Sequence, residues 1–259
     1  MTFPNYPDKY SSSPIINPED SEKYRKSTGH SASRLIPRSV IIYYSRHLKN
    51  FIENTHSVQR QKGFYGAEMV LLDDYRQTIG CIGNFGFGAP VTIAVCEELI
   101  ALGIRNIVSV GLAGTLQKSL KPGDIVVCNK AIRDEGTSHH YLPPSKYAYA
   151  ASNLTERLTG VLTEKSIPYT AGTGWTVDAP YRETVDEVRQ YQEEGVCTVD
   201  MEASAIFSVA EFRKVNAGAI FVVSDSLATL SWEPAFHTAE TNAGLETALN
   251  VSIEALASR

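Results

Sequence analysis

Two acidic residues follow apolar runs typical of β-strands, and their carboxyl groups could take part in acid–base chemistry. Glu202 lies in "TVDMEASAIF", where a short β-branched run passes directly into an apolar helix pattern. Asp225 follows Ser224 at the end of the apolar run in "FVVSDSLA". Partial burial at the mouth of a parallel sheet can raise the pKa of a carboxyl group toward proton donation. Both also have structural interpretations, Ser224-Asp225 as a helix cap and Glu202 as an acid in a first helical turn.

Two glycine-containing stretches could bring backbone amides close to an anion. In "GNFGFGAP", Gly86 and Gly88 precede a helix N-terminus, which favours negative charge. This stretch is not a dinucleotide fingerprint, because Val91 stands at the third glycine position and no acid closes the next strand. In "SVGLAGTLQ", Gly111 and Gly114 could form an anion-binding concavity, but a glycine turn with positive φ is the simpler interpretation.

The elements that must position these residues alternate between strand and helix. Apolar runs predict strands at 39–44, 67–72, 78–83, 106–111, 123–127, 167–172, 198–200 and 217–224. Helical spacing predicts helices at 45–53, 89–103, 150–165, 181–195, 203–207 and 243–258, and residues 131–146 read as a long polar loop. Several strands are apolar on both faces, so we expect an α/β fold with three αβα layers around a mainly parallel, mixed sheet. Ligands bind such sheets outside the carboxyl ends of the strands.

The domain organisation follows from composition. Residues 1–37 are rich in Ser, Pro, Tyr and charge and lack periodicity, which predicts an N-terminal arm that either orders on contact or stays disordered. Residues 38–259 form one domain, as expected for a chain of 259 residues with no internal repeat.

Composition also limits the classes of molecule that the protein is expected to bind. A net charge of −5 gives no electrostatic reason to bind nucleic acid or an anionic membrane, and no apolar run is long enough to span a bilayer. The N-terminus does not resemble a secretory signal. The four cysteines form no CxxC pair, so we expect reduced thiols, no metal and a cytoplasmic location. The pair His139-His140 lacks a third ligand in view.

Taken together, these stretches resemble the purine nucleoside phosphorylase/uridine phosphorylase family. The resemblance begins near Ser39 and covers most of the chain, with its motifs in the order and spacing of the family. The most specific motifs are "GFGAPVTIAVCEELIALGIRNIVSVGLAG", "KPGDIVV", "AIRDEGTSHHYLPP", "VDAPYRE", "VDMEASAIF" and "VVSDSLA".

The resemblance implies roles at the sugar and base ends of a nucleoside site. Met201 would pack against the pentose, and Glu202 would accept hydrogen bonds from its hydroxyls. Breaking the N-glycosidic bond builds positive charge on the sugar and negative charge on the base, and Glu202 and Asp225 would stabilise these two charges as the catalytic pair. By the same resemblance, the base pocket would contain Ser224, Asp225, Val177 and Tyr181, with Pro180 in place of a phenylalanine common in the family.

The sequence departs from the family at the positions that would bind phosphate. Tyr43 and Tyr44 stand near an expected glycine, and Ser109 and Leu112 stand where the family has an arginine and a Ser/Thr. Arginine forks bind phosphate bidentately, which a serine cannot do. The resemblance leaves Gly86, Ser109, Lys62 and Arg46 as the phosphate-binding candidates, with Lys62 corresponding to an arginine lent by a neighbouring subunit. Arg133 is a further cation within the matching region.

The resemblance therefore implies an enzyme, a pentosyltransferase that cleaves a nucleoside with phosphate as the nucleophile and favours purines. It needs no cofactor, and phosphate is the co-substrate. A homo-oligomer (dimer, trimer or hexamer) is expected, because family sites borrow residues from a neighbour. Two alternatives remain open at this point, namely a nucleoside hydrolase that uses water and a non-catalytic nucleoside-binding or storage protein.

Overall fold

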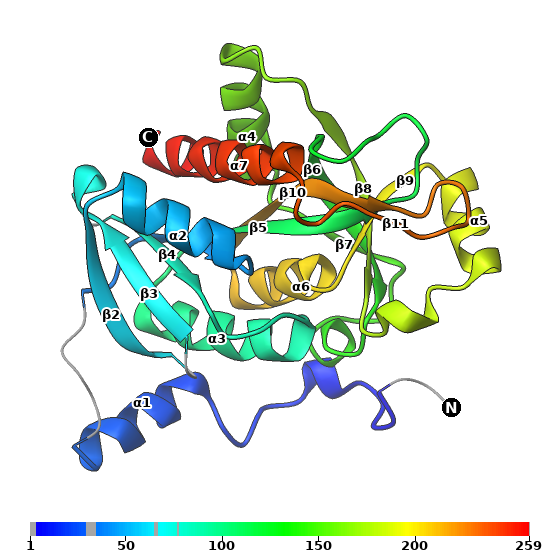
Figure 1. Cartoon of the computed structure of the whole chain (residues 1–259). Coiled ribbons are helices and arrows are strands. Elements are labelled where there is room, and N and C mark those ends of the chain that lie inside the picture. Colours follow the sequence, from blue (N-terminus) through cyan, green and yellow to red (C-terminus); the bar gives the residue numbers. More distant parts are fainter. Residues whose placement is uncertain (1–3, 30–34, 65–66, 77, 259) are drawn as a thin grey trace.

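The structure is a computed structural model. It describes residues 4–29, 35–64, 67–76 and 78–258, although the side chains of residues 62–64 lie outside the described part. Figure 1 shows the arrangement of the elements along the chain.

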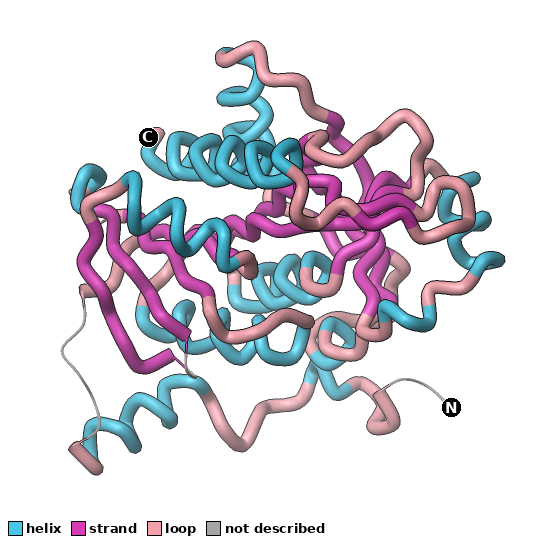
Figure 2. Tube along the Cα trace, in the orientation of Figure 1, coloured by secondary structure: helices cyan, strands magenta, loops and turns pink. Residues whose placement is uncertain are grey.

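One mixed sheet forms the centre of the molecule (Figure 2). Its strands in the described residues are β1 (Ser39–Tyr43), β2 (Val58–Phe64), β3 (Ala67–Leu72), β4 (Ile79–Gly83), β5 (Asn106–Thr115), β6 (Ile125–Asp134), β7 (Tyr147–Tyr149), β8 (Thr170–Val177), β9 (Val196–Asp200), β10 (Asn216–Ser226) and β11 (Glu233–Pro234). Parallel pairs join β1 to β4 and β5, β5 to β10, and β8 to β6 and β9. Antiparallel pairs join β10 to β6 and β9 to β5, so the pairings of β5, β10, β6, β8 and β9 close into a ring.

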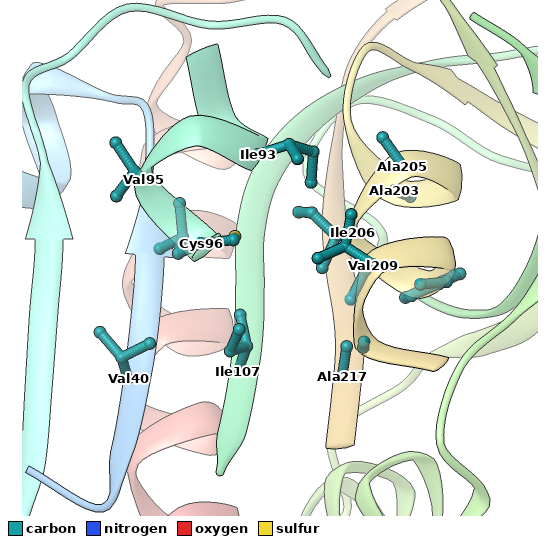
Figure 3. Packing of buried hydrophobic residues seen from close by; sticks show 14 of the residues in the cluster. Val40, Ile93, Val95, Cys96, Ile107, Ala203, Ala205, Ile206, Val209 and Ala217 are labelled. Carbon is teal, nitrogen blue, oxygen red and sulfur yellow. The ribbon is translucent and has the colours of Figure 1, made fainter. Parts of the chain in front are cut away.

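Helices cover both faces of the sheet, as Figure 1 shows. The helices of the described residues are α1 (Pro18–Ser27), α2 (Arg46–Thr55), α3 (Ala89–Leu102), α4 (Ser152–Glu164), α5 (Val185–Glu193), α6 (Ala203–Arg213) and α7 (Ala239–Ala257). On one face, α3 and α6 pack on the strands, with Cys96 of α3 and Ile206 of α6 in the same buried cluster as Ile107 of β5 (Figure 3). On the other face, α2, α4 and α7 form a second apolar core that includes Leu48, Leu158 and Leu249. The expected α/β fold with helices on both sides of a mixed sheet is confirmed.

The sequence missed one strand, and two of its local predictions were wrong. The polar segment "VQRQKGF" forms β2, which pairs with β3. Strand β6 continues through the predicted loop as far as Asp134, because Ala131 and Ile132 are buried and pair with β7 and β8. Gly111 and Gly114 do not have the positive φ expected of a turn, since they lie within β5.

The described part of the N-terminal segment lies along α3 (Figure 1). Its helix α1 begins with a capping box in which Asn17 and Asp20 bond each other's backbone amides. Arg25 of α1 donates a hydrogen bond of 2.6 Å from Nη1 to Oε1 of Glu98 on α3, whose side chain is only 3% exposed. This ion pair links α1 to α3. None of the described helices combines the length and apolar character needed to cross a bilayer.

Candidate active site

A cavity of about 590 Å³ lies at the carboxyl ends of β5, β9 and β10. This is the end of the strands at which ligands bind in open α/β sheets. Its lining includes Arg46, Met201, Glu202, Ser224 and Asp225, five of the site residues predicted from the sequence. Further lining residues that the sequence did not indicate as site residues include Tyr44, Phe87, Glu183, Phe236, His237 and Asn242. A larger hollow, of about 850 Å³, lies between the N-terminal segment and α3 and contains none of the predicted residues.

Asp200 explains why the chain passes from β9 to α6 through two acids. Its Oδ2 accepts hydrogen bonds from the backbone amides of Glu202 at 2.8 Å and Ala203 at 2.7 Å, and its Oδ1 accepts one from the Thr176 hydroxyl at 2.8 Å. These bonds satisfy amide groups that the first turn of α6 leaves without helical partners. Asp200 therefore caps the helix and frees Glu202 from that structural role.

Glu202 lines the cavity, although its residue surface is only 7% exposed. One carboxyl oxygen, Oε1, accepts a hydrogen bond of 2.5 Å from the backbone amide of Gly88, at the N-terminus of α3. Burial, and then the nearby charge of Asp200, raises the pKa of Glu202 above its ordinary value. Gly88 has φ near +102°, a conformation that glycine adopts without strain, so the "GFG" turn serves to hold this acid.

Asp225 is held from two sides at the end of β10. Its Oδ1 accepts a hydrogen bond of 2.6 Å from the Ser224 hydroxyl, and its Oδ2 accepts one of 3.0 Å from the indole Nε1 of Trp232. The pairing of β10 with β5 shifts register between Val223 and Asp225. Such a bulge re-aims the side chains that follow it, here toward the cavity.

Glu202 and Asp225 face the same cavity, as the sequence predicted. Glu202 follows β9 and Asp225 lies in β10, and these strands do not pair with each other, since β5 lies between them. Gly114 of β5 pairs with Val199 on one side and with Asp225 on the other. The two acids therefore approach the cavity from opposite sides of β5.

Beside β1 and β5, Tyr44 and Leu112 contribute neutral side chains to the cavity wall. The Tyr44 hydroxyl lies 3.3 Å from Oγ of Ser109, within hydrogen-bond range, and Ser109 is buried behind it. Leu112 lines the cavity directly. Burial, and then the charge of Glu202, raises the pKa of Tyr44, so this hydroxyl keeps its proton near neutral pH. Tyr44 and Ser109 supply hydrogen-bond donors here but no charge.

Arg46 carries the one permanent positive charge among the lining residues that the structure describes. It also borders a second hollow of about 600 Å³, together with Lys49, Asn84 and Gly86. The imidazole of His47, which lines the main cavity, is engaged by Glu246 at 2.7 Å. The side chain of Lys62 lies outside the described part of the structure.

Besides Gly86 and Ser109, three further residues singled out in the sequence do not line the cavity. Val177 is buried in a small apolar cluster with Trp175 and Val188, and Tyr181 is 99% exposed. Arg133 is buried elsewhere, where its guanidinium donates to Oγ and O of Ser138 and to the Pro143 carbonyl. Pro180 does line the cavity.

Metal binding finds no support in the arrangement of the side chains. Within the described ranges, no three His, Cys, Asp or Glu side chains are grouped closely enough to hold an ion. His139 instead has a ring nitrogen 3.1 Å from the carbonyl oxygen of Arg133.

Comparison with known proteins agrees with this arrangement. Residues 40–257 match the family model described as the phosphorylase superfamily. The chain belongs to this superfamily. A DeoD-type purine nucleoside phosphorylase from Bacillus cereus is 28% identical over 183 residues, which cover 70% of this chain and 76% of the relative. A relative with the same description from Bacillus mycoides is also 28% identical over 183 residues.

Solved structures of the superfamily share the fold. A purine nucleoside phosphorylase from Toxoplasma gondii, in complex with immucillin-H, superposes with a TM-score of 0.75 at 24% identity and covers 86% of this chain and 91% of its own. A uridine phosphorylase from Vibrio fischeri superposes with a TM-score of 0.73, also at 24% identity and with the same coverage.

Proposed function

We propose that this member of the superfamily cleaves the N-glycosidic bond of a nucleoside with inorganic phosphate as the nucleophile. The observation that carries this proposal is the cavity at the ends of β9 and β10, because one acid, Glu202, faces it from the start of α6 and a second, Asp225, faces it from β10. Relatives named purine nucleoside phosphorylase support both the reaction class and a purine as the base.

The sugar would lie beside Met201 and Glu202. As the bond from C1′ to the base nitrogen lengthens, the pentose gains positive charge, which a fixed carboxylate stabilises in a cavity of low polarity. The short bond from Gly88 holds the Glu202 carboxyl in place before the sugar arrives, so little reorganisation is needed during the reaction.

The base would lie beside Ser224 and Asp225. The electron pair of the broken bond moves onto the base, and a carboxyl group on this side stabilises that charge through a hydrogen bond or a proton. The bonds from Ser224 and Trp232 orient Asp225 for this contact. A phosphate oxygen then forms the new bond to C1′, which gives the free base and a pentose 1-phosphate.

Phosphate would be bound at the end of the cavity that contains Tyr44 and Arg46. Arg46 supplies the charge, and the hydroxyl of Tyr44 supplies a neutral donor. Gly86, Ser109 and Lys62 remain candidates on the strength of the family resemblance alone. We further propose a cytoplasmic homo-oligomer, in which a neighbouring subunit would complete the phosphate site.

A panel of purine and pyrimidine nucleosides, each with and without phosphate, tests the proposal. Released base and pentose 1-phosphate are both measured by chromatography. The proposal predicts that purine nucleosides release base only when phosphate is present, with equal amounts of the two products. Equal base release without phosphate would mean that water is the nucleophile, and binding without any base release would mean that the protein is not an enzyme of this class.

A further inference from the structure

A third carboxyl group lines the base end of the cavity. Glu183 directly follows the 3-10 turn Pro180–Arg182 and directly precedes Thr184, the residue that caps α5. The capping box between Thr184 and Glu187 fixes the start of α5 and therefore the backbone on which Glu183 is carried. Pro180, three residues earlier, lines the same cavity.

Glu183 has no structural partner that would account for its position. It is half-buried, and no donor within the described ranges forms a hydrogen bond to its carboxyl group. The charged groups near it are Asp225 from β10 and Glu187 from α5. His237, from the segment before α7, lines the same cavity. Burial, and then the charges of Asp225 and Glu187, raises the pKa of Glu183 to about 7.

Asp225 is arranged differently from Glu183. The indole Nε1–H of Trp232 can only donate, so Oδ2 of Asp225 must act as an acceptor in that bond. The Ser224 hydroxyl occupies Oδ1 at 2.6 Å. Both oxygens of Asp225 are thus engaged before any base binds, whereas the carboxyl group of Glu183 is free of such bonds and faces the same space.

We propose that Glu183 is the acid that protonates the departing base, while Asp225 orients the base by hydrogen bonding. This inference rests on the proposed function. As the bond between C1′ and the base nitrogen breaks, its electron pair moves onto the base, and the proton of the Glu183 carboxyl group transfers to a ring nitrogen of that base. Glu183 is left as a carboxylate and recovers a proton from solvent when the neutral base leaves. Phosphate supplies the new bond to C1′, so atoms and charge balance.

The step predicts a particular pH dependence. Glu183 donates a proton only in its neutral form, and that form is lost as the pH rises through about 7. The turnover of an ordinary purine nucleoside should therefore fall above that pH. A nucleoside methylated at N7 already carries a positive charge on the imidazole ring of its base, so no proton has to be added to N7 as the bond to C1′ breaks. Its turnover should not depend on Glu183 in this pH range.

The experiment compares wild type, Glu183→Gln and Glu193→Gln on inosine and on 7-methylinosine, each over a range of pH with saturating phosphate. Glutamine keeps the size of Glu183 and can form hydrogen bonds, but it cannot transfer a proton. Glu193 is an exposed acid at the end of α5 and provides a control that removes the same charge outside the cavity. Thermal unfolding of each variant checks that it folds.

We expect Glu183→Gln to lower kcat on inosine by about a hundredfold, as is typical when a general acid is removed. The same variant should keep kcat on 7-methylinosine within about threefold and lose the fall in rate above pH 7. Glu193→Gln should match wild type on both substrates. An equal loss on both substrates, or no loss on inosine, would overturn the role of Glu183 while leaving the proposed function intact. If wild type cleaves neither nucleoside, the proposed function fails and the role of Glu183 fails with it.

Discussion

A Cβ atom placed on Gly114 would lie 3.0 Å from Oδ2 of Asp225. The same atom would lie 3.2 Å from Cγ1 of Val199, on the opposite neighbouring strand. Because Gly114 has no side chain, the Asp225 carboxyl group fits against β5 at this position, where β5 also pairs with β9. The glycine acts through its lack of a side chain and not through an unusual backbone angle, since its φ is not positive.

Gly114→Ala should displace the Asp225 carboxyl group and lower kcat at least about tenfold, with a stability loss of about 1–3 kcal/mol from overpacking. Turnover and chemical denaturation measure the two effects. Gly160→Ala is the matched control, because Gly160 lies in α4 with open space around it. That substitution should leave turnover unchanged and stabilise the protein by about 0.5–1 kcal/mol. Wild-type turnover in Gly114→Ala would contradict the proposed role of Asp225.

Glu202→Ala and Asp225→Ala should each lower turnover by about a hundredfold or more, because each removes a positioned group from the transition state. Circular dichroism should show an unchanged fold in both variants. If both retain near-wild-type rates, neither acid belongs to the reaction, and the assignment of the cavity as an active site fails.

Trp232→Phe should lower kcat by about tenfold or less. The substitution keeps an aromatic ring but removes the Nε1–H donor to Asp225, and a hydrogen bond to a charged group contributes about 1.5–3 kcal/mol, toward the low end at an exposed site. Trp232 lies at the surface, so its stability effect should be small. The rate on nucleosides with different bases measures the effect, and an unchanged rate on all of them would show that this bond does not orient Asp225.

Glu202→Gln should stabilise the unliganded protein increasingly as the pH rises, although it lowers activity. The carboxyl of Glu202 ionises near pH 4.5 in the unfolded chain, and burial beside Asp200 raises that pKa in the folded protein. Below pH 4.5 both states are protonated and ionisation has no cost. Above it, the unfolded chain releases its proton first, so the folded state loses stability with rising pH.

The gain from Glu202→Gln should therefore be small at pH 5 and about 1 kcal/mol or more at pH 8. Thermal unfolding of both proteins at the two pH values tests this. A gain that is equal at both, or a loss at pH 8, would show that the charge of Glu202 does not destabilise the fold.

Arg46→Ala should raise the KM for phosphate at least about tenfold and leave the KM for the nucleoside within about threefold, since loss of a charge-assisted contact weakens anion binding by about 1.5 kcal/mol or more. Arg189→Ala, an exposed arginine on α5, is the control. An unchanged KM for phosphate in Arg46→Ala would transfer the role to another cation, such as Lys62.

Apolar, β-forming runs placed the two acids at or just after strand ends, but each acid alone also fitted a helix cap or a first helical turn. Their catalytic roles were predicted from the resemblance to the family, through the order and spacing of its motifs. The helices α3 and α7 were equally predictable, since apolar residues recur along them and Gly103 ends α3 with a φ of +115°.

Glu183 and Trp232 could not be found in this way. Each lies in an irregular segment, and only tertiary folding brings these segments beside Asp225. Strand β2 was missed because its sequence is polar, which an edge strand tolerates when it pairs on one side only. Tyr181 was expected in the base pocket because of its position in a family motif. That position gave no information on the direction of its side chain, which faces solvent.

The most direct test of the central claim is the formation of pentose 1-phosphate from a purine nucleoside by wild type and by Asp225→Ala, followed in parallel with base release. We predict that wild type forms the two products in equal amounts, only when phosphate is added, and that Asp225→Ala forms about a hundredfold less of both. Base release by wild type without added phosphate, or undiminished product formation by Asp225→Ala, would contradict it.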